Sequence, residues 1–545
     1  MKFGFNPLFS LLSAGVVCIS ATGAFAEDAV SYVDPWSKDE KSTIIYERTD
    51  GADGSTVVTV TSGNHNDGDI TGGKSTLSVK ETTIILNGGE NIKRIIGGNE
   101  DYGYVEGDRN IIINGGEADY IYGGDWYVEP NRGGGYITGY DSPEKYGVQS
   151  SSDAWCPKKS VGDINITVNG GTIGQIRGGH NCADGVNIDP KLNPKIDMGW
   201  SVDENGNATD KRPYSVGGNV NILISGGTVG TGYDDAIRGA GGSWCSVDGN
   251  VNITVEKEAL VKGNIYAGAR NVYGQVGGTS VTITGGRVEG SIYAGGSYSS
   301  QSTITQGDTA VTLSGGEITG SVYAAGDRDI VQGGTSVTIT GAGSSVGGSI
   351  YGGGIDNGST VAGERLLMVD AAYTGTHEYS IMDFTQADID ASISLSEIAT
   401  AAEGTTVTLG QGTTLTLNSV LVTEGALVFN GGLGTVAFAE GANLTLNGTI
   451  IDLGGTDVKL GSDLTLQVAD VENVGDNVTL FEQAGEGSVY EGVTITFTDA
   501  AGGTKTAKLT RDADGSIHTA AVPEPTTATL SLLALAALCA RRRRR

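Results

Sequence analysis

Two neighbouring carboxylates are the residues of this chain best suited to chemistry. Asp234 and Asp235 stand together after Gly232 and Tyr233. Carboxyl groups placed on either side of a glycosidic bond can act as general acid and general base in its hydrolysis. This pair is therefore the first candidate for catalysis, and the surrounding elements decide whether such a site is assembled.

Two other acidic segments could hold a cation. Asp512 and Asp514 precede Gly515 as in the opening of a calcium loop, but Pro523 stands where a bidentate Glu would complete it. We interpret this segment as the turn of a β-hairpin. Asn64, Asp67 and Asp69 could also gather around a cation, but the sequence lacks the nonapeptide iteration of calcium β-rolls. We expect neither a metal site nor a cofactor.

Cysteine usage favours a disulfide over a zinc site. Three of the five cysteines, Cys156, Cys182 and Cys245, lie between the terminal segments, none with C-x-x-C spacing, and the four histidines are scattered. Cys182 and Cys245 occupy nearly the same place in neighbouring copies of the repeat described next. We predict a Cys182–Cys245 bridge in an oxidising compartment, with Cys156–Cys182 as the rival pairing.

A repeat dominates the middle of the chain. Each copy has a short strand of alternating residues, two glycines, a β-branched residue and a second short strand ending in glycine. Copies start near Thr83, Asn110, Asn165, Asn221, Asn252, Ser280, Ala310 and Ser336. Repeats of this length are typical of solenoids, in which one unit cannot bury its apolar face alone.

The period of two predicts which side chains lie inside. The inward set in one copy is Val281, Ile283, Val288 and Ile292, and the outward set is Thr282, Thr284 and Tyr293. This pattern predicts an all-β fold, an elongated right-handed parallel β-helix with glycines at corners that need a positive φ. A β-sandwich array is the alternative.

Six segments are predicted along the chain. They are a signal peptide at 1–26, an N-terminal segment or cap at 27–79, glycine-rich β-helix repeats at 80–365, tighter rungs at 366–470, a β-hairpin cap at 471–521 and a sorting signal at 522–545. The tighter rungs keep the alternation but lose the double glycine, and the cap would hide the open edge of the solenoid.

The repeat region resembles two groups of β-helical proteins. Residues 80–521 resemble the passenger-like regions of autotransporter adhesins, with a sorting tail where a membrane barrel would follow. Asp234 and Asp235 resemble the paired aspartates of polygalacturonase-like hydrolases, but no Asn-Thr-Asp lies upstream and no Gly-His-Gly downstream. We therefore interpret the aspartates as loop residues and expect no enzymatic activity.

The N-terminus has the pattern of a secretion signal. Lys2 is followed by an apolar stretch at 8–19, and Ala24 and Ala26 flank Phe25 immediately before Glu27. This A-x-A arrangement predicts cleavage by signal peptidase after export through the general secretion machinery, which gives a mature chain that begins at Glu27.

The C-terminus combines a short apolar span with a basic end. The motif residues are Val522, Pro523, Glu524 and Pro525, and the terminal residues are Arg541, Arg542, Arg543, Arg544 and Arg545. A helix over residues 526–540 would reach about 22 Å of a hydrocarbon core about 30 Å thick, so it is a marginal transmembrane anchor. The arginines would stay on the cytoplasmic side.

This order of parts resembles the PEP-CTERM sorting signal of Gram-negative bacteria. In that family the signal is recognised by exosortase, a membrane-embedded cysteine protease, and its bearers are often made alongside extracellular polysaccharide. The resemblance implies a precursor held transiently in the inner membrane, processing near Pro523–Pro525, and delivery to the cell envelope, cell surface or extracellular matrix.

Composition narrows the function further. The net charge is −30, from 64 acidic and 34 basic residues, so the chain repels nucleic acid. We expect an exported structural or adhesin-like protein that could contact extracellular polysaccharide or host glycan. The alternatives are a β-helical polysaccharide lyase or glycoside hydrolase, and a carbohydrate-binding module.

Four tyrosines are the candidate glycan strip. Tyr266, Tyr293, Tyr323 and Tyr351 each follow a predicted inward aliphatic residue in consecutive copies. Stacked rungs would align them as an outward aromatic ladder. Either the neighbouring rings stabilise the stack, or the ladder offers a flat surface to a sugar.

Overall fold

The computed structural model describes most of the repeat region. It covers residues 44–73, 79–98, 105–125, 162–180, 215–241, 246–270, 274–297, 303–355, 359–374, 379–430, 433–446, 450–468, 478–498 and 504–521. Every regular element among these residues is a β-strand. A search of the same ranges finds no helix with the length and hydropathy that a membrane crossing requires.

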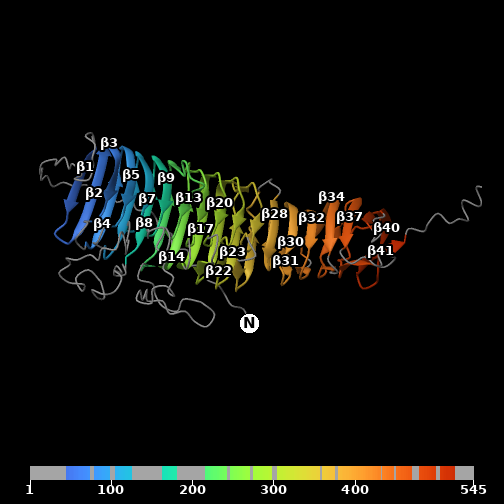
Figure 1. Ribbon diagram of the computed structural model, residues 1–545. Coiled ribbons are helices and arrows are strands. Elements are labelled where there is room, and N and C mark those ends of the chain that lie inside the picture. The colour runs from blue at the N-terminus through green and yellow to red at the C-terminus, as the bar shows by residue number, and fades with distance from the viewer. Residues whose placement is uncertain are drawn as a thin grey trace, which may run out of the picture.

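The strands coil along one long axis, from the blue β1 end to the red β41 end in Figure 1. Strands one turn apart pair in parallel and in register. Asn221 of β11 (Val220–Ile224), for example, lies between Asn165 of β8 (Ile164–Val168) and Asn252 of β14 (Ser246–Val255). The predicted all-β, solenoid-like fold is therefore confirmed.

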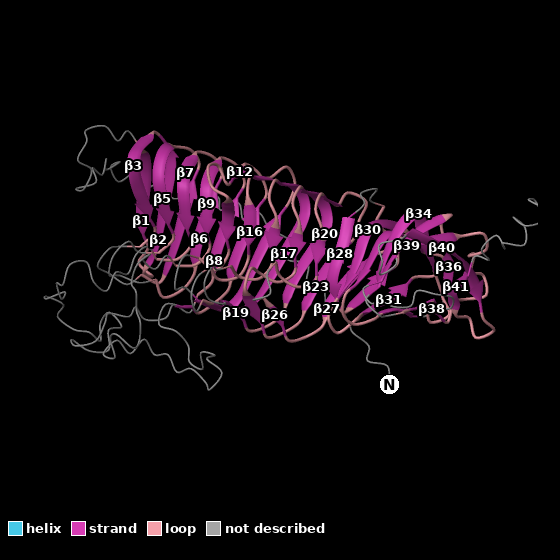
Figure 2. Cartoon of the chain, turned by 45° about the vertical axis from the view of Figure 1, so that its right-hand side comes forward, coloured by secondary structure: helices cyan, strands magenta, loops and turns pink. Residues whose placement is uncertain are grey.

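Two long sheets run along the coil, seen as stacked rows of strands in Figure 2. The first sheet contains β2 (Ser55–Ser62), β4 (Glu81–Leu86), β6 (Arg109–Ile113), β8, β11, β14, β17 (Gln275–Val288), β20 (Thr309–Ile318), β23 (Thr335–Ile339), β27 (Arg365–Val369), β29 (Gln386–Ile389), β31 (Thr405–Leu409), β33 (Leu427–Asn430), β35 (Ile451–Asp452) and β38 (Thr479–Glu482). The second sheet contains β3 (Asn64–Thr71), β5 (Glu90–Ile96), β7 (Glu117–Tyr122), β9 (Thr172–Arg177), β13 (Asp235–Arg238), β16 (Asn264–Tyr266), β18 (Ile292–Tyr293), β21 (Val322–Tyr323), β25 (Ile350–Tyr351), β28 (Tyr379–Phe384), β30 (Ile393–Thr400), β32 (Thr414–Val422), β34 (Thr435–Leu446), β37 (Asp463–Val468) and β39 (Thr494–Thr498). Short strands complete the turns: β10 (Ser215–Val216), β12 (Thr228–Val229), β15 (Leu260–Val261), β19 (Thr303–Thr305), β22 (Asp329–Val331), β24 (Ser345–Val346), β26 (Thr360–Val361) and β36 (Asp457–Lys459).

Inward aliphatic side chains form one continuous core. The predicted inward residues Val281, Ile283, Val288 and Ile292 are fully buried, whereas Thr284 on the opposite face is exposed. Burial of a Val or Ile side chain contributes about 1.5–3 kcal/mol, and the turns supply such residues at every level. The apolar core is therefore the main force that holds successive turns together.

Glycine has two different roles at the corners. Gly286 has a φ of +72°, a conformation that glycine enters readily, as predicted for the double-glycine corner. Gly178, which ends the second strand of its turn, is not among the positive-φ residues. A Cβ there would lie 2.0 Å from the carbonyl oxygen of Gly239, one turn later. The positive-φ prediction is wrong at this corner, because close approach of successive turns is what requires glycine.

The turns shorten beyond β27. Val337 and Leu367 pair across neighbouring turns and are 30 residues apart, whereas Leu367 and Ala387 pair at a separation of only 20 residues. This change occurs where the double glycine disappears from the sequence.

The coil begins earlier, and its cap is smaller, than the sequence suggested. β2 already pairs in parallel with β4, so the first turn starts at Ser55, and β1 (Ile45–Asp50) covers its edge in antiparallel orientation. At the other end, β38 and β39 still belong to parallel turns. Only β40 (Thr504–Arg511) and β41 (Ile517–Ala521) form the antiparallel hairpin that covers the last turn.

Candidate functional site

The four tyrosines of the repeat form a single stack. The ring centroids of Tyr266 and Tyr293 are 4.4 Å apart, those of Tyr293 and Tyr323 are 4.8 Å apart, and those of Tyr323 and Tyr351 are 4.5 Å apart. The interplanar angles are 5°, 2° and 12°. The parallel register produces this arrangement, because equivalent side chains on neighbouring strands lie about 4.8 Å apart.

Stacking leaves little ring surface for a ligand. Tyr266, Tyr293 and Tyr323 are each only 8% exposed, although they form a cluster separate from the main core. The two inner rings have both faces covered by neighbours, so a sugar could reach only their edges and hydroxyl groups. The geometry favours the stabilising interpretation of the ladder, and glycan binding by the strip stays a prediction.

The hydroxyl groups of the two inner tyrosines of the stack, Tyr293 and Tyr323, are kept neutral. Burial raises the pKa of Tyr293, although hydrogen bonds with Tyr266 and Ser291 oppose the increase. Burial also raises the pKa of Tyr323. These two inner tyrosines therefore carry phenol groups, not phenolates.

The aspartate pair lies at the start of β13 and is used in ion pairs. Oδ2 of Asp235 accepts a hydrogen bond from the Arg238 guanidinium at 2.9 Å and lies 3.4 Å from Nη1 of Arg270. Its backbone oxygen accepts a hydrogen bond from Nε2 of Gln175 at 2.7 Å. Burial raises the pKa of Asp235, and the charge of Arg270 opposes this. Asp234 is exposed. Asp234 therefore fits the interpretation as a loop residue, whereas Asp235 is the first residue of β13.

A second aromatic cluster was missed by the sequence analysis. Tyr120 and Tyr122 of β7 lie side by side with centroids 5.8 Å apart, and Tyr233 packs against Tyr120 at 5.2 Å. The guanidinium carbon of Arg177 lies 5.7 Å from the Tyr120 ring centroid and 5.3 Å from that of Tyr122. The one available signal was the Tyr-Ile-Tyr-Gly-Gly segment of β7, which matches the tyrosine position of the later copies.

A cluster of buried charged side chains lies on the inner face of the coil, in the turn that contains β6. Arg109 is fully buried where the preceding turn carries Thr82. Its Nη2 lies 3.4 Å from Oδ2 of Asp125, whose backbone N–H donates to Nδ1 of His180 at 2.9 Å. Burial lowers the pKa of Arg109, and the charge of Asp125 opposes this. The carboxylate of Asp125 therefore compensates the positive charge of Arg109 inside the coil.

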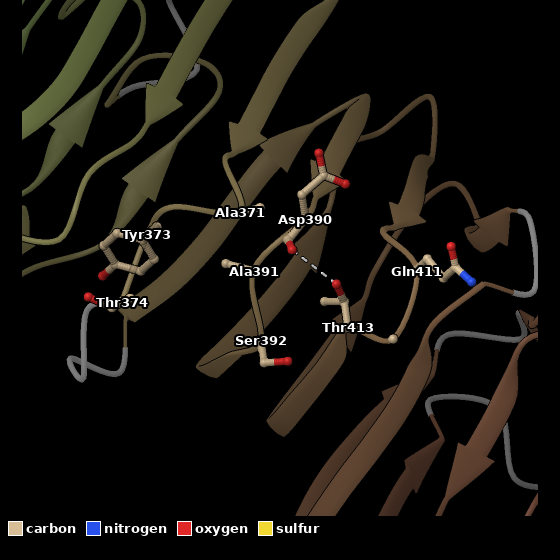
Figure 3. Close-up of a pocket in the computed structure, with 9 residues that line it drawn as sticks. Ala371, Tyr373, Thr374, Asp390, Ala391, Ser392, Gln411 and Thr413 are labelled. Carbon is tan, nitrogen blue, oxygen red and sulfur yellow. Dashed lines mark hydrogen bonds between the residues drawn. The ribbon is translucent and has the colours of Figure 1, made fainter.

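A shallow polar pocket of about 440 Å³ is lined by the segments that connect the first sheet to the second in three consecutive turns, after β27, β29 and β31 (Figure 3). Its lining includes Tyr373, Ser392 and Gln411, and Oγ1 of Thr413 donates to the backbone oxygen of Asp390 at 3.1 Å. Burial raises the pKa of Tyr373. These hydroxyl, amide and carboxyl groups could contact a polar molecule, but the lining contains no histidine or cysteine.

Of the two acidic segments considered for cations, the first lies in strand β3 and the second is the turn between β40 and β41. Asp69 accepts a hydrogen bond from Nε of Arg94 at 2.7 Å. The backbone N–H of Asp512 donates to the oxygen of Ser516 at 2.9 Å, and Gly515 has a φ of +92°, so the predicted hairpin turn is confirmed. Across the ranges that the structure describes, no three His, Cys, Asp or Glu side chains are grouped as metal ligands.

The remaining predicted site residues lie outside the described residues. These are Ala24, Ala26, Glu27, Cys156, Cys182, Cys245, Val522, Pro523, Glu524, Pro525, Arg541, Arg542, Arg543, Arg544 and Arg545. Signal cleavage, the disulfide and the processing site therefore stay predictions.

Comparison with known proteins identifies the C-terminal segment. A family model described as the PEP-CTERM protein-sorting motif matches residues 521–545. Neither a curated protein nor a solved structure matches the chain. The matched segment begins at the last residue of β41, where the coil has just been closed by its hairpin. Residues 521–545 are thus a PEP-CTERM protein-sorting motif, and the chain is an exported, cell-envelope-associated protein that exosortase targets.

Proposed function

We propose that this chain is a structural or adhesin-like protein of the cell surface or extracellular matrix. One observation carries the proposal: an elongated coil with a continuous core from Val58 to Ile517 leads directly into the sorting motif at residue 521. A coil of this kind is a stiff scaffold with two long sheet faces. We assign the coil a right-handed sense, because parallel crossover connections are right-handed in about 98% of cases.

The proposed route to the surface uses both ends of the chain. Signal peptidase would cleave after Ala26, and the short apolar segment at 526–540 would hold the precursor in the inner membrane. Exosortase would then process the chain near Pro523–Pro525, where the two prolines keep the backbone extended.

We also propose that the coil is not a catalyst. The ion pairs of Asp235 with Arg238 and Arg270 support this, because they occupy the carboxylate oxygen that would have to reach a substrate. Carbohydrate binding is the second candidate function, and the partly exposed ring of Tyr233 beside charged side chains supports it. A lyase or hydrolase remains the less supported alternative.

The sorting step can be tested by replacing Pro523, Glu524 and Pro525 together with alanine. We expect this variant to accumulate in the inner membrane with its C-terminal Arg545 intact, whereas the parent chain reaches the surface or the medium. Replacement of Thr526, Thr527 and Thr529 with alanine is the matched control, and it should leave sorting unchanged. Equal surface delivery of the first variant would contradict the proposed route.

A further inference from the structure

Tyr233 reaches across one complete turn of the coil. It belongs to the loop before β13, whereas its partner Tyr120 belongs to β7, and β9 lies between these two strands (Figure 1). The ring centroids are 5.2 Å apart with 51° between the planes. The Tyr233 hydroxyl donates a hydrogen bond to the Tyr120 hydroxyl at 2.5 Å. The loop is therefore fixed to a residue 113 positions earlier in the chain.

Gly174 of β9 makes this crossing possible. A Cβ on Gly174 would lie 3.0 Å from a ring carbon of Tyr233 and 2.4 Å from the carbonyl oxygen of Asp119. Gly230 and Gly232, with φ values of +101° and +90°, shape the loop that carries the ring. One side of the Tyr233 ring therefore rests on the backbone of β9, and the ring is only partly buried.

The ring is held in place before any ligand arrives. Tyr120 packs beside the guanidinium group of Arg177, whose Nε donates to Oε1 of Gln175 at 2.8 Å. Burial and the hydrogen bond to Tyr120 raise the pKa of Tyr233, so its hydroxyl stays neutral. A side chain that is already fixed loses little conformational entropy on binding, which favours affinity.

Polar groups lie beside the platform. Nζ of Lys93 lies 2.6 Å from Oδ2 of Asp119, and both side chains are about half exposed, at 44% and 50%. Lys93 is also 6.0 Å from the centroid of the Tyr120 ring. A carboxylate and an ammonium group side by side offer an acceptor and donors to adjacent hydroxyl groups, while an aromatic ring packs on the apolar face of a pyranose.

Charge indicates which kind of sugar fits. Asp119 is paired with Lys93, and Asp235 is paired with Arg238 and Arg270, so the carboxylates near the ring are already neutralised by cationic side chains. The chain as a whole carries a net charge of −30, which repels an approaching polyanion. A neutral sugar meets no such barrier.

We propose that Tyr233 is the stacking platform of a binding site for a neutral pyranose unit of a polysaccharide, and that Asp119 and Lys93 bind its hydroxyl groups. This inference goes beyond the proposed surface role because it assigns a ligand class and a site. It does not depend on sorting, since binding can be measured on the purified chain. It also differs from the tyrosine ladder, where neighbouring rings cover the faces that a sugar would need.

A glycan array probed with the full chain in mild detergent tests the site, using neutral and uronate-containing glycans. We expect binding to neutral glycans, a loss of at least about tenfold in affinity in Tyr233→Ala, and near-parent affinity in Tyr233→Phe, which keeps the ring. Asp119→Asn should weaken binding several-fold without removing the platform. Met368→Ala is the control, because Met368 is 42% exposed on β27, several turns beyond the platform, and this variant should leave binding unchanged.

Three results would overturn the proposal. They are unchanged binding in Tyr233→Ala, binding that is confined to uronate-containing glycans, and no binding to any neutral glycan. If circular dichroism shows that Tyr233→Ala loses its fold, Tyr233→Leu replaces it, because Leu can cover Gly174 but lacks a flat ring. An equal loss in Met368→Ala would also overturn the proposal, since it would attribute the effect to the coil as a whole.

Discussion

The tyrosine ladder makes a quantitative prediction about coupling between turns. Tyr293 is 8% exposed and stacks on Tyr266 at 4.4 Å and on Tyr323 at 4.8 Å. Replacement of a buried aromatic ring with alanine costs about 3–5 kcal/mol, and each aromatic pair contributes about 0.5–1.5 kcal/mol beyond burial. Tyr293→Ala removes two such pairs, so stacking should account for about 1–3 kcal/mol of its effect.

A double-mutant cycle isolates the contribution of ring stacking to the free energy of unfolding. The unfolding free energies of Tyr266→Ala, Tyr293→Ala and the double variant, measured by urea denaturation, should give a coupling of about 0.5–1.5 kcal/mol. The control cycle joins Tyr266 and Tyr323, which are separated by one ring, and should give a coupling below about 0.5 kcal/mol. Indistinguishable couplings in the two cycles would refute the stacking argument, because burial alone acts on each ring independently.

Three further predictions follow from the buried charges and from the tail. Asp125→Asn should destabilise the coil by about 3–5 kcal/mol, because it leaves the fully buried Arg109 guanidinium without its carboxylate. The double variant with Arg109→Met should be more stable than Asp125→Asn alone. Urea denaturation of both variants checks this order. Burial raises the pKa of Asp329 above its unfolded value, although the hydroxyl of Thr303 donates a hydrogen bond to its carboxylate at 2.6 Å. The folded state therefore binds more protons than the unfolded state, and stability should fall as pH rises from about 3.9 toward the raised pKa. The unfolding free energy of Asp329→Asn, measured over the same pH series, should lack this decline, and parallel curves would contradict the assignment. Mass spectrometry of protein taken from the cell surface or medium should find a chain that lacks Arg541–Arg545, and an intact C-terminus there would indicate an ordinary membrane anchor.

The inward face of the coil could be predicted because it depends on local alternation. Val281 and Ile283 are buried as their period of two requires, and the same rule placed Thr284 outside. The rule also placed Tyr293 outside, and its ring does lie apart from the main core. Its low exposure could not be predicted in the same way, because rings from other turns, 27 and 30 residues away along the chain, provide the covering surface.

Charged residues at inward positions show another limit of the pattern. Arg109 occupies an inward position of β6, where alternation predicts an apolar or small side chain. The carboxylate that compensates it belongs to Asp125, and the histidine that positions Asp125 follows 55 residues later. Nothing in the spacing of these residues indicates contact, since the distance along the chain depends on how many residues lie between successive turns.

Register explains why such distant residues can still form a site. Asn110, Asn165 and Asn221 pair in order across turns of 55 and 56 residues, and Asn252 continues the row after only 31. Turns of different length therefore keep the same strand positions opposite each other, which fits the slow growth of loop-closure cost with length. Tyr233 and Tyr120 meet for this reason: they are 113 residues apart in the sequence, but β7 and the strand that follows Tyr233 are only two turns apart in the sheet.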